Sequence, residues 1–167
     1  MTGKLGSDVA VLMGSKSDLE VMKPAAQVCR KLGLSVDVRV LSAHRTPEQT
    51  AAYVRDTAKA GTKVFICGAG GAAHLAGAVA AHTTHPVIGV PIASGGLQGI
   101  DALLSTAMMP PGIPVATVAI GGAENAGLLA AQIIALGDPA LAKAVAAERE
   151  ARLQKVLEAD AEVRDKW

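Results

Sequence analysis

The sequence predicts an α/β fold built on a central parallel sheet. Five short runs of mostly apolar residues alternate with helical patterns, and most of these runs are nearly continuous, as in strands buried on both faces. Strand followed by helix, repeated, indicates parallel strands joined by right-handed crossovers. The length of 167 residues suits a single domain over 1–167, with a core over 8–137 and a C-terminal helix over 138–167.

The alternation begins with a strand and a capped helix. Leu19, Cys29 and the apolar residues between them recur at helical spacing, and Gly33 provides a stop. Ser17 and Glu20 match a capping box at the start of this helix. The five strands are expected at residues 8–14, 35–41, 63–68, 86–91 and 114–120.

A second helix is expected directly after the second strand. Thr46 and Gln49 match another capping box, Pro47 suits the first helical position, and Gly61 closes the helix. The strand and helix alternation is thereby repeated, as a parallel sheet requires.

The last helix is highly charged and is predicted from Asp138 and Pro139 to about Asp160. Thirteen of the charged residues in the chain lie from Asp138 onward. The apolar positions of this helix form only a thin stripe. Two interpretations stay open: the helix packs on its own domain, or it is an arm that lies on a neighbouring subunit.

Residues 64–137 contain only two charged side chains, Asp101 and Glu124. A small domain leaves much of its surface in water, so a monomer of this size cannot hide that much uncharged chain. Either a membrane or other subunits must cover it. Glycines and His74 interrupt the uncharged segment 64–81, and prolines follow closely, which argues against a membrane span. We therefore expect a homo-oligomer with extensive interfaces and no membrane insertion.

Composition argues against several other classes of protein. The net charge of +1, with no basic run or aromatic platform, argues against nucleic acid as a partner. Cys29 and Cys67 have no metal or redox spacing and are expected to be reduced, buried thiols. Reduced thiols, together with an N-terminal apolar run too short for a signal peptide, predict a cytoplasmic protein.

The four histidines do not predict a metal site. His82 and His85 lie three apart near a predicted helix end, with Pro86 next, and are expected to form a solvated cap and turn. No second cluster of ligands stands at a matching spacing, so no metal is expected. His74 follows a glycine-rich loop and has two open interpretations: a satisfied helix histidine, or a residue that lines a pocket.

Three predicted strand ends carry unusual loops: GSKSD at 14–18, SAHRTP at 42–47 and GAGGAAHLAG at 68–77. Ligands of an open parallel sheet collect at the carboxyl ends of its strands. Gly14 permits a tight turn, and Ser15, Ser17 and the following amides face the positive end of a helix, which suits a phosphate. Ser17 and Asp18 can equally be simple caps. If Asp18 touches ligand, it should accept from sugar hydroxyls, because it would repel a phosphate.

The glycine-rich loop is a weak match to a dinucleotide fingerprint. Gly68, Gly70 and Ala73 occupy the right places, but the loop follows the third strand and no acid stands about 20 residues on. We therefore expect no nicotinamide or flavin cofactor. The glycines instead allow close backbone approach, so we expect a small pocket lined by N–H groups for a carboxylate or a similar small group.

His44 is the candidate acid–base. It stands at a strand end among small residues, before a helix start and next to Arg45. A neighbouring cation favours the neutral form of an imidazole, and Arg45 can bind a phosphate bidentately. The residues thus predict a phosphate held by Ser15, Ser42 and Arg45, with His44 delivering acid–base chemistry to the compound that the phosphate positions.

These motifs resemble a known family. VLMGSKSD, LSAHRTPE, GAGGAAHLAG, GVPI and GIPVATVAIGGAENAGLLAAQIIA, in this order over residues 8–135, resemble the PurE family, the N-carboxyaminoimidazole ribonucleotide mutases of bacterial purine biosynthesis. The resemblance implies a flavodoxin-like three-layer α/β sandwich assembled as an octamer. It also implies transfer of a carboxyl group from an exocyclic amine to a ring carbon of aminoimidazole ribonucleotide, without ATP, metal or organic cofactor.

The resemblance also implies roles for individual residues. Ser15 and Arg45 resemble phosphate contacts and Asp18 a ribose contact, Ser42 lies on the phosphate loop, and His44 matches the general acid–base. The segment Gly68–Leu75 resembles the family's loop that encloses the migrating carboxyl group. Its candidate ligand residues are Ala69, Gly70, Gly71, His74 and Leu75.

A sister class in this family carboxylates aminoimidazole ribonucleotide directly with carbon dioxide, and its histidine motif usually continues with lysine. Arg45 follows His44 here, which favours the mutase. Two segments depart from the family pattern: Ser94–Gly99 is richer in glycine, and AIGGAENAG at 119–127 is a shorter loop. Both departures concern loop mobility more than chemistry.

Overall fold

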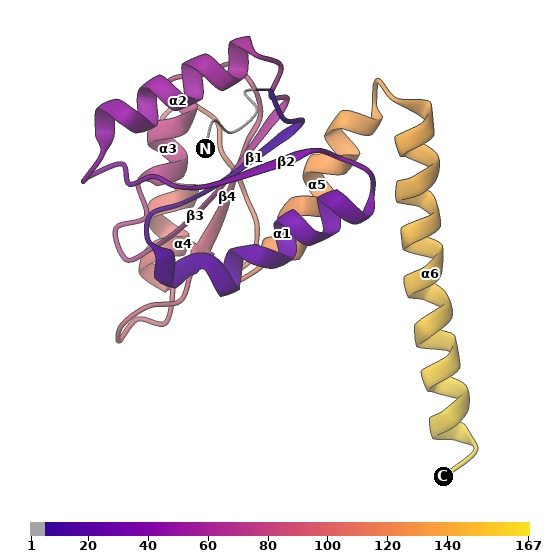
Figure 1. Ribbon diagram of the computed structural model, residues 1–167. Coiled ribbons are helices and arrows are strands. Elements are labelled where there is room, and N and C mark those ends of the chain that lie inside the picture. Colours follow the sequence, from indigo (N-terminus) through magenta and orange to yellow (C-terminus); the bar gives the residue numbers. More distant parts are fainter. Residues whose placement is uncertain (1–5) are drawn as a thin grey trace.

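The computed structural model describes residues 6–167 and shows a parallel sheet between two layers of helices (Figure 1). All the strand pairs in the sheet are parallel, and the strand order is β2-β1-β3-β4-β5. This order, with helices on both faces, confirms the predicted flavodoxin-like α/β fold. The strands are β1 (Val9–Met13), β2 (Val36–Val40), β3 (Val64–Gly70), β4 (Val87–Ile92) and β5 (Ala116–Thr117).

Each face of the sheet has its own apolar core. Val9, Val11 and Met13 of β1 point to one face, while Ala10 and Leu12 point to the other, as the period of two in a strand requires. The first face is covered by α1 (Leu19–Lys31) and α5 (Ala123–Ala135). The second is covered by α2 (Pro47–Lys59), α3 (Leu75–Ala80) and α4 (Ile100–Ala107).

The predicted strands are confirmed, but the fifth is much shorter than 114–120. Only Ala116 and Thr117 pair regularly with β4. The chain stays attached beyond them, because the amides of Val118 and Gly121 donate to the carbonyls of Gly89 and Pro91 at 3.1 and 2.9 Å. The edge strand therefore continues irregularly towards α5.

The predicted capping box of Ser17 and Glu20 is wrong, because the chain turns two residues earlier. A short 3₁₀ turn, Lys16–Asp18, precedes α1 and has Ser15 as its N-cap. The Ser15 hydroxyl accepts from the amide of Ser17 at 3.3 Å, and the Asp18 carboxylate accepts from the amide of Ser15 at 3.1 Å. The capping box is therefore Ser15 and Asp18, which places both side chains directly at the end of β1.

The predicted capping box of Thr46 and Gln49 is also wrong, although Pro47 does begin α2. Thr46 stands at the N-cap but its side chain makes no bond to the helix amides. Its hydroxyl instead accepts from the amide of Ser42 at 2.9 Å and lies 3.1 Å from the Ser42 carbonyl, to which it can donate. Thr46 thus ties the end of the loop after β2 to its beginning at Ser42. Gly61, with a φ of +108°, follows the end of α2 as expected.

The last helix, α6, runs from Pro139 to Arg164 and is capped by Asp138, as predicted. Leu141 and Val145 join the core beside α5. Glu148, which is nearly buried, accepts from Lys31 of α1 at 2.6 Å and from Arg152 at 3.0 Å. The pKa of Glu148 lies below its usual value, mainly because Lys31 donates this hydrogen bond to its carboxylate.

Arg152 also donates to Glu124 of α5 at 2.6 Å, and beyond Arg152 the helix makes no ion pair with another element of residues 6–167. Every residue from 151 to 167 is exposed, and Figure 1 shows this part of the helix projecting away from the sheet layers. The first half of α6 therefore packs on its own chain, as one interpretation predicted, while contact of the exposed second half with a neighbouring subunit stays a prediction. Exposed apolar residues on this distal half are Leu153, Val156, Leu157 and Val163.

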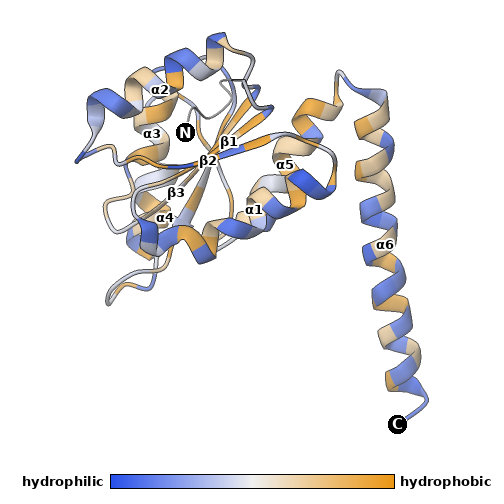
Figure 2. Ribbon diagram, viewed as in Figure 1, coloured by the Kyte–Doolittle hydropathy of each residue, from blue (hydrophilic) through white to orange (hydrophobic). Residues whose placement is uncertain are grey.

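A second unpartnered apolar surface, here called the α4 stripe, consists of Leu97, Ile100, Leu104 and Met108. The last three stand one helical turn apart, and all four side chains are more than half exposed. In contrast to this exposed stripe, the apolar residues of the strands and α5 gather inside the fold (Figure 2). Within residues 6–167, no helix combines the length and the apolarity needed to cross a membrane.

We predict that Gly127→Ala destabilises the fold. Gly127 of α5 faces α1 so closely that an added Cβ would lie 2.7 Å from the carbonyl oxygen of Ala25 and would also meet Val28. Overpacking of this kind costs about 1–3 kcal/mol of unfolding free energy, which urea denaturation measures. Gly137→Ala is the matched control, because no atom lies within 4 Å of its added Cβ. Equal stability of the two variants would contradict the close packing of α1 on α5.

Candidate active site

The carboxyl ends of β1, β2, β3 and β4 surround a cavity of about 220 Å³. The chain leaves β1 for β2 on one side and reaches β3 on the other, so the cavity lies at the topological switch point of the sheet, where ligands of such folds bind. The three predicted loops therefore meet. The cavity is lined by Gly14, Ser15, Asp18, Ser42, Ala43, His44, Ala69, Gly70, Ala72, His74, Leu75 and Ser94.

The first loop is tied together by its own side chains. The Ser15 hydroxyl accepts from the hydroxyl of Ser17 at 2.9 Å, and Ser17 also lies 3.3 Å from the Asp18 carboxylate. Asp18 is thus part of the cap, as one of the two interpretations of this loop predicted, whereas the Ser17 side chain bonds only to the side chains of Ser15 and Asp18. Ser15 and Asp18 nevertheless also line the cavity, whereas Ser17 lies beside it.

The second loop is attached to the first through Arg45. Its guanidinium donates to the carbonyl oxygen of Gly14 at 2.6 Å, and its backbone amide donates to the Ser42 hydroxyl at 3.2 Å. Arg45 forms no ion pair with another residue in 6–167. A guanidinium has five N–H donors, so Arg45 keeps donors and a full charge for an anion beside Ser15 and Ser42.

The third loop brings a second imidazole to His44. Nε2 of His44 lies 2.8 Å from Nδ1 of His74, and the two rings meet edge to face at 82° with centroids 4.9 Å apart. One of these nitrogens must carry the proton and the other the lone pair, so the two tautomers are complementary. His74 therefore belongs to the pocket lining and makes no cap bond to α3.

Glycine is required where β3 ends against β4. A Cβ on Gly70 would lie 2.6 Å from the hydroxyl oxygen of Ser94 and 3.1 Å from the carbonyl oxygen of Ile92. Gly71 follows with a φ of +61°, a backbone conformation that favours glycine. The loop thus turns sharply over the cavity, as the close backbone approach inferred from the glycines requires.

The structure places most of the predicted site residues around the cavity and adds three others. Gly71, Ser17 and Arg45 lie beside the lining within the same loops, and Ala43, Ala72 and Ser94 line it without having been predicted. Ser94 follows β4 directly, so the rule that ligands collect at strand ends, applied to the fourth strand as well, could have found it.

The thiols and the remaining histidines take no part in this site. Burial raises the pKa of Cys29 to about 11 and that of Cys67 further, so both thiols stay protonated at neutral pH and do not serve as nucleophiles. Within the described part of the chain, no three His, Cys, Asp or Glu side chains gather as a metal site would need. His82 is exposed in the turn after α3, as predicted. His85 is half-buried, with Nδ1 2.7 Å from the carbonyl oxygen of Thr62, so the prediction that it is solvated is wrong.

Comparison with known proteins shows similarity over nearly the whole chain. The sequence model of the AIR carboxylase family matches residues 8–155. An N5-carboxyaminoimidazole ribonucleotide mutase of Synechocystis sp. is 50% identical over 155 residues, which cover 93% of this chain and 88% of the relative. A protein of the same name from Brucella melitensis is 52% identical over 153 residues, covering 90% of this chain and 94% of the relative.

Solved structures agree with the fold described above. A crystal structure of Treponema denticola PurE superposes with a TM-score of 0.84 at 33% sequence identity, and the match covers 92% of this chain and 96% of the other. The family model, which matches residues 8–155, includes every residue that lines the cavity.

We predict that the two imidazoles hold each other in single, complementary tautomers. Long-range ¹H–¹⁵N spectra at neutral pH should show one defined tautomer for His44 and one for His74. In His74→Ala, the His44 ring should become a tautomer mixture like that of the exposed His82, which serves as an internal reference. A mixture at His44 already in the unsubstituted protein would refute the hydrogen bond.

Proposed function

Because the chain belongs to the AIR carboxylase family, we propose that it is a mutase that converts N5-carboxyaminoimidazole ribonucleotide to carboxyaminoimidazole ribonucleotide in purine biosynthesis. The reaction moves a carboxyl group from the exocyclic amine to a ring carbon. The observation that carries this proposal is the placement of His44 in one cavity with an anion site and a glycine-rich loop.

The cavity offers a separate place for each part of the substrate. Ser15, Ser42 and the guanidinium of Arg45 lie together between the first two loops and suit the phosphate. Asp18 faces the same cavity and, as a carboxylate, suits the ribose hydroxyls. The carboxyl group then lies against Ala69 and Gly70, where the loop leaves room for a small group only.

The chemistry proposed for this arrangement needs only a proton carrier and a closed space. The N-carboxylate leaves as carbon dioxide, and the exocyclic nitrogen takes up a proton from the imidazolium form of His44, which leaves His44 neutral as a base. The enamine-like ring carbon then attacks the trapped carbon dioxide, and His44 removes the proton from that carbon. One proton enters and one leaves, so the histidine is regenerated over the cycle. Water must be kept out, because carbon dioxide that escapes is lost to the reaction.

His74 has a defined place in this proton transfer. Nε2 of His44 lies within hydrogen-bond distance of Nδ1 of His74. A proton can therefore pass through Nε2 in one of two ways. Either the substrate displaces His74 from Nε2, or His74 itself relays the proton. The contact also fixes the orientation of the His44 ring before the substrate arrives, which lowers the cost of aligning it.

The alternative activity is direct carboxylation of aminoimidazole ribonucleotide with carbon dioxide. The family takes its name from such a reaction, but the similar relatives in Synechocystis sp. and Brucella melitensis are named mutases. In this chain His44 is followed by Arg45, not by the lysine of the carboxylating class. These observations favour the mutase.

We also propose that the protein works as a homo-oligomer, of the octameric kind that its family resemblance implies. The α4 stripe and the distal half of α6 leave two apolar surfaces in water in the isolated chain. The cavity of about 220 Å³ lies below the range of roughly 300–1,000 Å³ typical of ligand pockets. His44 and His74 are exposed as well. A neighbouring subunit that extends the walls would both enlarge and close the site.

We predict that His44→Asn abolishes turnover while nucleotide binding stays nearly intact. Loss of a general acid–base lowers kcat by about 10²–10⁴-fold, whereas the phosphate contacts at Ser15 and Arg45 are untouched. A coupled assay with N5-carboxyaminoimidazole ribonucleotide measures kcat, and calorimetry measures binding. Assay of aminoimidazole ribonucleotide with bicarbonate in parallel separates the two activities. Full turnover by the variant would refute the role of His44, and efficient use of the second substrate pair alone would refute the mutase.

We predict that the double substitution Ile100→Asp, Leu104→Asp yields smaller assemblies with lower activity. Both side chains are about half exposed in the isolated chain, so charges there leave the monomer folded but oppose burial at an interface. Light scattering measures the mass of each species. Leu136→Asp is the matched control, because Leu136 is 90% exposed outside the stripe. An unchanged mass for the double variant would exclude the α4 stripe as an interface.

A further inference from the structure

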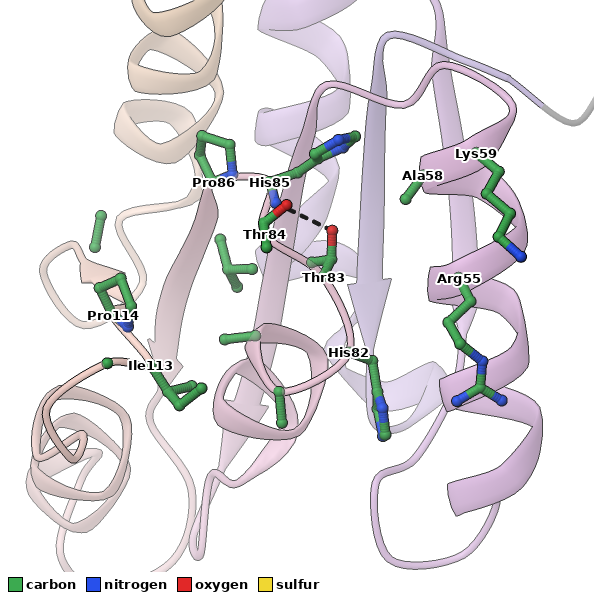
Figure 3. Close-up of a pocket in the computed structure, with 15 residues that line it drawn as sticks. Arg55, Ala58, Lys59, His82, Thr83, Thr84, His85, Pro86, Ile113 and Pro114 are labelled. Atoms are coloured by element: carbon green, nitrogen blue, oxygen red, sulfur yellow. Dashed lines mark hydrogen bonds between the residues drawn. The ribbon is translucent and has the colours of Figure 1, made fainter.

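A second and larger cavity lies at the opposite end of the sheet from the catalytic candidate. Its volume is about 970 Å³. The walls come from the second half of α2, the turn that follows α3, the first residues of β4 and the loop that leads into β5 (Figure 3). These are amino ends of strands, so no residue of the site described above takes part.

One side of this cavity is cationic. Arg55 and Lys59 stand one turn apart on the same face of α2, and His82 reaches the opening from the turn after α3 (Figure 3). No acidic residue lines the cavity. Neither Arg55 nor Lys59 forms an ion pair with any residue in 6–167. The cavity thus presents uncompensated positive charge.

The other side of the cavity is apolar. Pro86, Ile113 and Pro114 lie across from Arg55 and Lys59 in Figure 3, and Val87, a buried residue at the start of β4, also lines the cavity. Such a wall covers a planar ring without needing hydrogen bonds from it. The cavity therefore suits a ligand with an anionic group at one end and an aromatic or apolar body at the other.

The backbone does not favour an anion here, so the side chains must hold it. α2 and α3 both end at this cavity, and their carboxyl ends carry the negative ends of the helix dipoles. Lys59 is in the last turn of α2, where a cation stabilises the helix whether or not a ligand is bound. Arg55 stands one turn earlier and has no described partner. Arg55 is consequently the informative residue.

We propose that this cavity binds a nucleotide, with its phosphate at Arg55, Lys59 and His82 and its base against Pro86, Ile113 and Pro114. The volume lies within the range of about 300–1,000 Å³ that small-molecule pockets occupy. A guanidinium and an ammonium one turn apart match a phosphate by charge-assisted hydrogen bonds. The proposal is independent of the reaction proposed for the first cavity.

Equilibrium dialysis of the full-length oligomer with adenosine 5′-monophosphate tests this proposal. We expect two sites per chain, of which Arg55→Gln removes one and Arg45→Gln removes the other. The affinity of the Arg55 site should fall at least tenfold in Arg55→Gln, should be partly kept in Arg55→Lys, and should weaken as salt rises. Adenosine without phosphate should bind there at least tenfold more weakly. Lys155→Gln, an exposed lysine of α6, is the matched control.

Three results would overturn the proposal. The first is a single nucleotide site that Arg45→Gln removes and Arg55→Gln leaves unchanged. The second is binding of adenosine as tight as that of the monophosphate at the site that depends on Arg55. The third is a change in oligomer mass in Arg55→Gln, measured by light scattering, without loss of a nucleotide site; the cavity would then be a contact between copies of the chain.

Discussion

Parallel strands end on the same edge of a sheet, and this constraint decides where the side chains of the candidate site meet. β1 stands between β2 and β3, so the loops that follow these three strands are neighbours although up to 61 residues separate Gly14 from Leu75. The hydrogen bond from Arg45 to the carbonyl oxygen of Gly14 then fixes one loop against the next. A guanidinium tied in this way loses little further freedom when it binds an anion, which is the physical basis of a preorganised phosphate site.

The sequence predicted those features that depend on local pattern and on the sheet rule, and missed those that depend on side-chain packing. Strand positions, the three loops and the candidacy of His44 follow from apolar runs that end in unusual residues. Two serines and a threonine near a helix start allow several capping schemes, and the choice of Ser15 with Asp18 depends on where the chain turns. The contact of His44 with His74 spans 30 residues, so no local pattern could reveal it. The second cavity is lined by α2, the turn after α3 and the loop before β5, so it too depends on how segments distant in the sequence pack together.

The uneven distribution of charge has a structural counterpart. The nearly uncharged half of the chain supplies buried strands and α5, but it also supplies the α4 stripe, which the chain itself does not cover. The charged C-terminal segment supplies α6, whose first half is held by Lys31, Glu148 and Arg152 and whose second half extends past the chain. These ion pairs fix the direction of the helix. The apolar residues beyond them are exposed and are available to pack against another surface. A neighbouring subunit of the proposed oligomer would cover these surfaces and exclude water from the candidate active site at the same time.

The polarity of the helices gives the two ends of the sheet opposite electrostatic properties. Helix amino ends face the edge that holds the candidate active site, where backbone amides and the capping residue Ser15 favour an anion. Helix carboxyl ends face the second cavity, where Arg55 and Lys59 must overcome the dipoles to bind the same kind of group. Binding at the first edge is therefore shared among many fixed dipoles, whereas binding at the second rests on a few flexible side chains. The two sites therefore depend on different groups at opposite ends of the strands and can change independently while the fold between them stays the same.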